Sequence, residues 1–355
     1  MKKIKQRLYY LDIARGFAIF GMFTQHCMIV HEVSGGEGES LFANVMTLLG
    51  TAPSAPVFMM IMGIFSAKSK TDPLKLMLRG IKLLVLGFAL NLFRFTMPLL
   101  VAMLLLDSGE LQLTGDNTLV KLSFYVDILQ LAGLSLIFCA LLKKIAVPRK
   151  SILLLIFIIL FVSPFLWGLF EGNLVSALFW GEADNVTFPF FPWAVYPLLG
   201  ISLSQCLTDS SVLDQNLKKI RYCGFILAVL GALMLLLSTL KVLAFNIISP
   251  TGDYFRSGAS IHFLIIGFIL SWLPICRWSE QTFTVENSII QVLIFWSRNV
   301  TAIYFIQWTL FGWSMLIFGT NQQNAPVSAA IGLAVLLATH FSVKKAWIRN
   351  LFSWV

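Results

Sequence analysis

Long runs of apolar residues, separated by short polar segments, extend along the chain from its beginning to its end. A helix that spans a bilayer needs about 20 mostly apolar residues. Only helices suit such runs, because open backbone in lipid leaves amide groups without hydrogen-bond partners. The pattern predicts an all-α, polytopic membrane helix bundle of about ten transmembrane helices, the third and ninth long enough to tilt or to include a half-helix. The ten runs lie near residues 13–32, 43–66, 79–106, 122–142, 151–171, 189–206, 222–245, 259–276, 289–318 and 325–343.

The polar segments between these runs alternate in charge along the chain. One set is basic, and the other set is acidic or neutral, with Lys121 as an exception. Cytoplasmic loops of membrane proteins are enriched in Lys and Arg. We therefore predict ten crossings with both termini in the cytoplasm. The basic set contains Lys2, Lys3, Lys5 and Arg7, then Lys68, Lys70 and Lys75, then Lys143, Lys144, Arg149 and Lys150, then Lys218, Lys219 and Arg221, then Arg277, and finally Lys344, Lys345 and Arg349.

The composition is typical of a membrane protein and excludes other classes. Apolar residues make up 58% and charged residues 12% of the chain, with a mean hydropathy of +0.83. A soluble domain has about 25% charged residues, so disorder and nucleic-acid binding as a main function are excluded as well. The five cysteines show no CxxC and no metal-ligand spacing, so we expect no metal. We expect a single integral-membrane domain over residues 1–355.

Few charged residues lie inside the apolar runs, and such residues in membrane helices tend to mark function. The first run carries Asp12, Arg15 and His26. Arg15 and His26 are eleven residues apart, so they share one helix face at a separation of about 16 Å along the axis. Each of these polar groups also has a purely structural interpretation, which stays open. Asp12 and Arg15 would form an i,i+3 ion pair, and a buried His26 would be bonded to a neighbouring carbonyl. His31 lies about 140° around the helix from His26, and we expect it at or beyond the outer interface.

Two further groups of polar residues lie in later runs. Asp127 lies near the outer end of the fourth run and Arg94 in the outer half of the third, at a depth similar to that of His26. They form either a structural ion pair inside the membrane or a group that acts together with His26. Arg298 and Asn299 lie in the cytoplasmic half of the ninth run, where an arginine either pairs with a helix end or binds an anion.

The stretch Leu11–Phe20, LDIARGFAIF, resembles the first helix of the transmembrane acyltransferase superfamily. Within it, the acyltransferase-3 families carry an arginine, ten residues and then a histidine, and Arg15 and His26 match this spacing. Other stretches resemble the heparan-α-glucosaminide N-acetyltransferase-like branch, in which the position of His26 is typically Asn and the catalytic histidine lies later, before the second helix. These stretches are Ala55–Phe58 with Gly63, Asp127–Gln130, Phe191–Trp193 with Gly200, and Ser297–Asn299 with Tyr304.

The resemblance implies acyl transfer across the membrane. The donor would be a cytoplasmic acyl-CoA, with acetyl-CoA as the expected co-substrate, and the acceptor a hydroxyl or amine of an extracytoplasmic, saccharide-like molecule. His26 is the expected catalytic base, with His31 as second choice, since a neutral histidine can take the acceptor's proton; an acyl-histidine intermediate stays open. Asp127 is expected to orient the histidine ring. The residues expected to bind CoA are Arg15, Arg298 and Asn299, with the basic loop from Lys68 to Arg79.

Functions of other classes stay open at this point. A proton-coupled transporter or flippase would use His26 and Asp127 as a proton relay and move its substrate without CoA. A membrane sensor or scaffold would carry out no chemistry. We expect a multi-pass protein of the cell membrane, in a bacterial inner membrane, whose partners are acyl-CoA, the acceptor and the lipid bilayer but no nucleic acid. A homodimer is left open.

Overall fold

The computed structural model describes residues 7–33, 41–51, 54–105, 118–167, 169, 173–181, 186–240, 254–284 and 286–354. Over these residues seven helices are long and apolar enough to cross a membrane, and two shorter apolar helices, Phe190–Leu203 and Ser288–Arg298, accompany them. The prediction of an all-α, polytopic helix bundle is therefore confirmed. The number of crossings and the side on which the termini lie stay predictions. The seven are Tyr9–His31, Leu41–Lys68, Pro73–Leu105, Leu213–Thr239, Ala259–Thr282, Val300–Phe318 and Ala325–Lys344.

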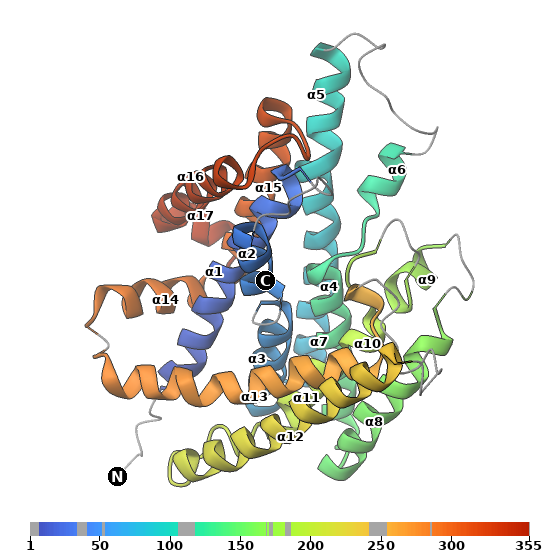
Figure 1. Cartoon of the computed structure of the whole chain (residues 1–355), viewed down its shortest axis with the longest axis vertical. Helices are drawn as coiled ribbons and strands as arrows, with labels where there is room; N and C mark the ends of the chain where they lie inside the picture. The colour runs from blue at the N-terminus through green and yellow to red at the C-terminus, as the bar shows by residue number, and fades with distance from the viewer. Residues whose placement is uncertain are drawn as a thin grey trace.

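The α-helices are numbered along the chain as in Figure 1, where α12 and α13 run side by side across the lower part of the molecule. Their bounds are α1 Tyr9–His31, α2 Leu41–Thr51, α3 Ala55–Lys68, α4 Pro73–Asn91, α5 Met97–Leu105, α6 Thr118–Ser123, α7 Ile128–Lys144, α8 Arg149–Val162, α9 Leu174–Phe179, α10 Phe190–Trp193, α11 Val195–Leu203, α12 Leu213–Thr239, α13 Ala259–Thr282, α14 Ser288–Arg298, α15 Val300–Phe318, α16 Ala325–Lys344 and α17 Ala346–Leu351.

The ninth apolar run is a half-helix followed by a second helix rather than one tilted helix. α14 ends at Arg298 and α15 begins at Val300, with Asn299 between them at φ −121° and ψ 26°. The Nδ2 atom of Asn299 donates a hydrogen bond to the Phe295 carbonyl at 2.8 Å. This bond satisfies one of the carbonyls that a helix end leaves without a partner. α14 packs against α1, so the break brings residues on both of its sides close to the first helix.

The third apolar run is continuous but contains a π-helical turn. This turn, Leu92–Thr96, joins α4 to α5 and carries Arg94. It lies close against α15, because a Cβ atom placed at Gly312 would be 2.0 Å from the Arg94 carbonyl oxygen. π-helical turns widen a helix locally and occur often at functional sites. The turn thereby directs Arg94 into the interior of the bundle, where only 1% of its surface is exposed.

Glycines hold α3 against α11, as small residues do in many pairs of membrane helices. A Cβ atom at Gly63 would lie 2.0 Å from the Pro197 carbonyl oxygen, and one at Gly200 would lie 2.0 Å from the Met60 carbonyl oxygen. Neither position can accept a side chain without separating the two helices. Since α3 forms part of the wall of the central cavity, this contact also determines the width of that cavity.

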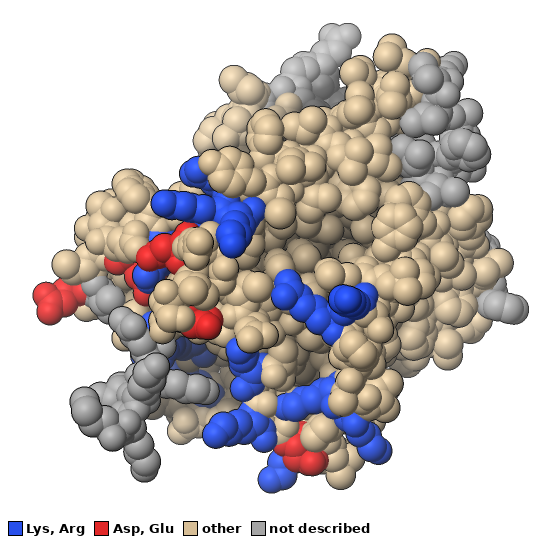
Figure 2. Space-filling view, turned by 90° about the horizontal axis from the view of Figure 1, so that it is seen from below, with Lys and Arg blue, Asp and Glu red and all other residues tan. Residues whose placement is uncertain are grey.

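The surface of the molecule divides into apolar and basic regions. α12 exposes large apolar side chains, with Phe225 66% and Ile226 63% exposed. Such a face would promote aggregation in water, but in a bilayer it contacts lipid. Lys and Arg side chains gather on the lower face, where Figure 2 shows few acidic side chains among them. The alternation of loop charge along the sequence predicts such a basic face, because every second loop of a helix bundle lies at the same end.

Candidate active site

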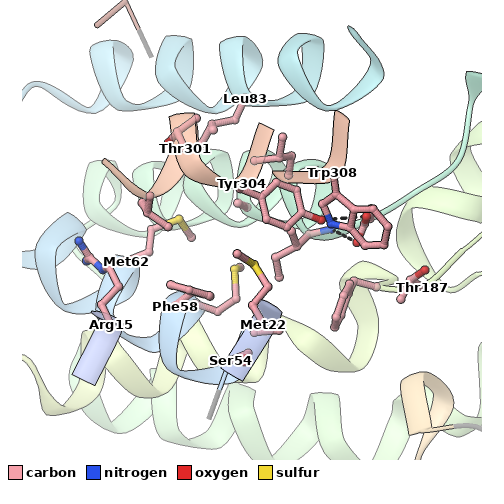
Figure 3. Close-up of a pocket in the computed structure, with 18 of the residues that line it drawn as sticks. Arg15, Met22, Ser54, Phe58, Met62, Leu83, Thr187, Thr301, Tyr304 and Trp308 are labelled. Carbon is pink, nitrogen blue, oxygen red and sulfur yellow. Dashed lines mark hydrogen bonds between the residues drawn. The ribbon is translucent and has the colours of Figure 1, made fainter. Parts of the chain in front are cut away.

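A cavity of about 530 Å³ lies between α1, α3, α4, α7 and α15. Figure 3 shows Arg15 and Met62 toward one end of it and Thr187 toward the other, with Met22 and Phe58 between them. The wall is mainly apolar with a few polar groups, which is typical of a site for a small molecule or a cofactor. Other polar residues that line the cavity are Gln25, Thr51, Ser66, Ser69, Arg79 and Tyr254.

His26 lines this cavity from α1 and is only partly buried. Its Nδ1 atom lies 2.9 Å from the Nε2 atom of Gln307 on α15. The ring packs against Trp308, with 4.2 Å between the ring centroids, and meets the Tyr304 ring edge to face at 6.4 Å. Among the residues that the structure describes, Gln307 is the one hydrogen-bond partner of the imidazole, so Nε2 is the nitrogen available to a substrate.

Arg15 lines the same cavity, about 16 Å from His26 along α1. Its Nη1 atom donates to the Ser297 carbonyl at a long 3.4 Å, and its guanidinium carbon lies 5.2 Å from the centre of the Phe65 ring. Asp12 forms an ion pair with Arg7, 2.9 Å from Nε to Oδ2, and accepts a hydrogen bond from Ser297. Asp12 is thus bonded elsewhere, and Arg15 retains N–H donors that point to no described acceptor.

Asp127 directly precedes α7, and its carboxylate lies at the centre of a cluster of polar groups that are hydrogen-bonded to one another. Its Oδ1 atom accepts from the Ile128 amide at 2.7 Å, which caps the helix. Its Oδ2 atom accepts from Arg94 Nη1 at 2.5 Å and from the Tyr304 hydroxyl at 2.8 Å. The remaining guanidinium nitrogens of Arg94, Nε and Nη2, donate to Asn91 Oδ1 at 3.2 Å and 2.9 Å. The structural ion pair is therefore the arrangement that the structure shows.

Asp127 does not contact the His26 ring in the described part of the chain. Its carboxylate is occupied by Arg94, Tyr304 and its own helix, as given above. Gln307 lies beside the ring instead, at hydrogen-bonding distance. These contacts do not support the expectation that Asp127 orients the catalytic histidine, which stays a prediction, although Asp127 does line the cavity.

His31 lies apart from the cavity, although it shares α1 with His26. It is completely buried rather than at the outer interface. Its Nδ1 atom is 2.9 Å from the Gly319 carbonyl, and its Nε2 atom is 2.9 Å from the Ser314 hydroxyl. Because a carbonyl can only accept, Nδ1 donates to it. Nε2 lies at hydrogen-bonding distance from the Ser314 hydroxyl, which itself donates to the Phe311 carbonyl at 2.8 Å. Both ring nitrogens are occupied, so this geometry does not support His31 as the second candidate for the base.

Arg298 and Asn299 are not among the residues that line the cavity. Arg298 is the last residue of α14, and its side chain is exposed. Asn299 holds the junction together through its bond to Phe295. The expected contact of these two residues with CoA is therefore not supported by their placement. Arg79, the last residue of the basic loop named above, does line the cavity.

Sequence reasoning missed Gln307 and Trp308, and it named Tyr304 only through the resemblance. All three lie on α15 and face His26 or Asp127. Gln307 is an uncharged polar residue in the middle of an apolar run, and its side chain is completely buried. Uncharged polar residues in membrane helices are costly, as charged ones are. An inspection of the apolar runs for glutamine as well as for charged residues would therefore have found Gln307.

A membrane-spanning helix bundle that encloses an arginine and a histidine in one mainly apolar cavity has the form of a membrane enzyme. The model of the acyltransferase-3 family, described as an acyltransferase domain, matches residues 8–343. Because the match covers nearly the whole chain, the protein belongs to this family and is a multi-pass, membrane-bound acyltransferase. The resemblance carried by Arg15 and His26 is confirmed. Searches of curated proteins and of solved structures returned no match.

Proposed function

We propose that this acyltransferase moves an acyl group, acetyl in the first instance, from a cytoplasmic acyl-CoA to a hydroxyl or amine of an extracytoplasmic, saccharide-like acceptor. The observation that carries the proposal is that Arg15 and His26 line one cavity, about 16 Å apart along α1. An anion-binding group and a proton acceptor then lie at two positions along a single path through the bundle.

The donor would enter by the Arg15 end of the cavity. Arg15 lies at that end, Arg79 also lines the cavity, and the basic lower face in Figure 2 would attract a polyanion. Guanidinium groups form strong, charge-assisted bonds to phosphate oxygens. The apolar wall formed by Met22, Phe58 and Met62 would then contact the pantetheine arm, whose length suits the distance between Arg15 and His26.

The chemistry would be direct general-base catalysis at His26. Its Nε2 atom takes the proton of the acceptor hydroxyl or amine while the acceptor oxygen or nitrogen attacks the thioester carbonyl carbon. The carbon–sulfur bond then breaks, and the thiolate of CoA receives the proton from the imidazolium. Such proton transfer typically contributes 10²–10⁴-fold to the rate. A covalent acyl-histidine would use the same atom, with His26 as the attacking nucleophile.

The acceptor would bind at the Thr187 end of the cavity. There the Tyr125 hydroxyl lies 2.5 Å from the Thr187 hydroxyl, and Tyr254 and Phe255 contribute aromatic rings. Hydroxyl groups beside aromatic faces suit a molecule with both polar and apolar faces, such as a sugar ring. We place the protein in a cytoplasmic membrane, the bacterial inner membrane, because that bilayer separates the CoA pool from surface saccharides.

Purified protein in liposomes would test the proposal. The assay adds [¹⁴C]acetyl-CoA and a surface-polysaccharide fraction, and measures free CoA thiol and labelled polysaccharide. We expect both products to form in equal amounts with the wild type, and to fall by at least about 100-fold in His26→Ala. Release of CoA thiol that does not depend on the protein would contradict the proposal. So would movement of the saccharide across the bilayer without acyl-CoA, which would indicate a transporter or flippase.

A further inference from the structure

The partner of His26 is an uncharged side chain with an incomplete set of hydrogen bonds. Gln307 is completely buried on α15, and its Nε2 atom lies 2.9 Å from His26 Nδ1. The other end of the amide, Oε1, is buried without a hydrogen-bond partner in the part of the chain that the structure describes. One end of the amide therefore contacts the base and the other end contacts no polar atom.

The orientation of this amide determines which nitrogen of His26 carries the proton. With Nε2 of Gln307 toward the ring, Nδ1 accepts a hydrogen bond, so the proton of the neutral ring is on Nε2, which then cannot take a proton from a substrate. With the amide rotated by half a turn, Oε1 accepts the Nδ1 proton and the lone pair of Nε2 faces the cavity. The two orientations occupy the same space.

Stability does not explain a glutamine at this position. In either orientation one buried amide atom has no described partner, which costs free energy. Leucine has a similar size and would carry no such unpaired atom. The ring of His26 is already confined by Trp308, with 4.2 Å between centroids, so Gln307 is not needed to hold the ring in place sterically. What leucine cannot do is accept the Nδ1 proton.

We infer that Gln307 is the positioning residue of this acyltransferase: its amide oxygen holds the Nδ1 proton of His26 and thereby presents Nε2 to the acceptor as the base. This inference rests on the proposed function, in which His26 takes the acceptor's proton. The glutamine occupies the place that a carboxylate has in the Ser-His-Asp arrangement, but without a charge that would need a partner inside the membrane.

Two substitutions at Gln307 and one control test this role. Gln307→Leu removes the acceptor for the Nδ1 proton. Gln307→Glu keeps an acceptor and adds a negative charge. Ser314→Ala is the matched control, because Ser314 is also a buried residue of α15 but is bonded to His31. Each protein is assayed for acetyl-CoA-dependent release of CoA thiol over a range of pH, and for its Tm in detergent.

We expect Gln307→Leu to lower kcat by about 10- to 100-fold, a part of the 10²–10⁴ that base catalysis contributes. Its KM for acetyl-CoA and its Tm should stay near those of the wild type. Gln307→Glu should recover most of the rate, with the acidic limb of the pH–rate profile shifted up by about one pH unit, because a neighbouring negative charge favours the imidazolium. Ser314→Ala should keep the wild-type kcat and profile.

The outcomes separate this inference from the proposed function. If His26→Ala is inactive but Gln307→Leu turns over normally, the role of Gln307 is wrong and the proposed function stands. If Gln307→Leu does not fold, Gln307→Glu decides, and an unshifted acidic limb would overturn the inference. A loss of rate in both variants with an equal loss of Tm would show a merely structural role. A wild type that consumes no acetyl-CoA would overturn both proposals.

Discussion

α1 meets α15 at two histidines five residues apart, and their surroundings differ. His31 is completely buried, and both of its ring nitrogens are bonded, to Gly319 and Ser314. His26 lines the cavity, and one nitrogen is bonded to Gln307 while the other has no hydrogen-bond partner among the described residues. Buried polar groups in proteins are normally fully hydrogen-bonded, so an incomplete one calls for an explanation. We interpret the closed site at His31 as structural, and the open site at His26 is the one that we propose for the chemistry.

The arginines of the cavity repeat this contrast. Arg94 is bonded to Asp127 and Asn91 and lies against aromatic rings, with 4.8 Å between its guanidinium carbon and the centre of the Trp308 ring. Within the described part of the chain, Arg15 has one long hydrogen bond, to the Ser297 carbonyl. The closed arginine holds helices together across the membrane interior, whereas the open arginine has donors to spare for a ligand.

The largest effect is expected from removing the open histidine. His26→Ala should lower turnover by about 10²–10⁴-fold, because the base is lost from the transition state. Binding of acetyl-CoA and Tm should change little, since the side chain has a single described hydrogen bond. Single-turnover rates, acetyl-CoA affinity and thermal unfolding in detergent measure these three quantities. Near-normal turnover of His26→Ala, together with an inactive His31→Ala, would show that His31 and not His26 is the catalytic histidine.

Breaking the closed arginine pair should act on stability first. Arg94→Ala leaves the Asp127 carboxylate buried without its partner, which costs about 3–5 kcal/mol. Replacing both members, with Arg94→Met and Asp127→Leu together, should restore much of the Tm because no charge stays unpaired. Thermal unfolding of the two variants checks the expectation. If Arg94→Ala keeps the wild-type Tm but loses turnover, the pair belongs to the chemistry and the contrast with Arg15 fails.

Arg15 and Arg298 should differ in their effect on the donor. Arg15→Ala should raise the KM for acetyl-CoA about tenfold, as expected for the loss of a hydrogen bond to a charged group, with a smaller change in kcat. Arg298 is exposed and lies outside the cavity lining, so Arg298→Ala should change the KM by less than about twofold. Initial rates at varied acetyl-CoA measure both. A larger effect at Arg298 would move the CoA site to the outside of α14.

The smallest effect on turnover is expected at the closed histidine. His31→Ala removes bonds to Gly319 and Ser314, which should lower stability by about 1–3 kcal/mol. Its kcat should stay within about threefold of the wild type when assayed below the melting range. Thermal unfolding and steady-state rates on the same preparation separate the two. A normal Tm combined with lost turnover would place His31 in the chemistry.

Periodicity and loop charge predict much of this fold because a membrane helix needs a long apolar run. The same runs do not show where a helix breaks. Residues 289–318 are long enough either to tilt or to include a half-helix, and only the three-dimensional structure shows that the run divides at Asn299, which bonds to Phe295. Arg298, the last residue of the first part, is exposed.

The sequence likewise predicts some features of the candidate site and not others. Arg15 and His26 could be assigned to one face because their spacing lies within a single helix. The partner of His26 could not, since it depends on which face of α15 packs on α1, and that packing brings together residues far apart in the sequence. Asp127 was the acidic residue expected at a depth similar to that of His26, but the helix cap and Arg94 occupy its carboxylate.

The central claim, that one cavity brings acyl-CoA from Arg15 to His26, is tested most directly by a cryo-EM structure with acetonyl-CoA. In this analogue a methylene group separates the sulfur from the carbonyl, so acyl transfer cannot occur. The account predicts the diphosphate beside Arg15, the pantetheine arm along Met22 and Phe58, and the ketone carbon near His26. Between the two there should be room for one acceptor atom, at about 3–3.5 Å from the ketone carbon and at hydrogen-bonding distance from Nε2. An analogue bound outside the cavity, or with its ketone far from His26, would contradict the account.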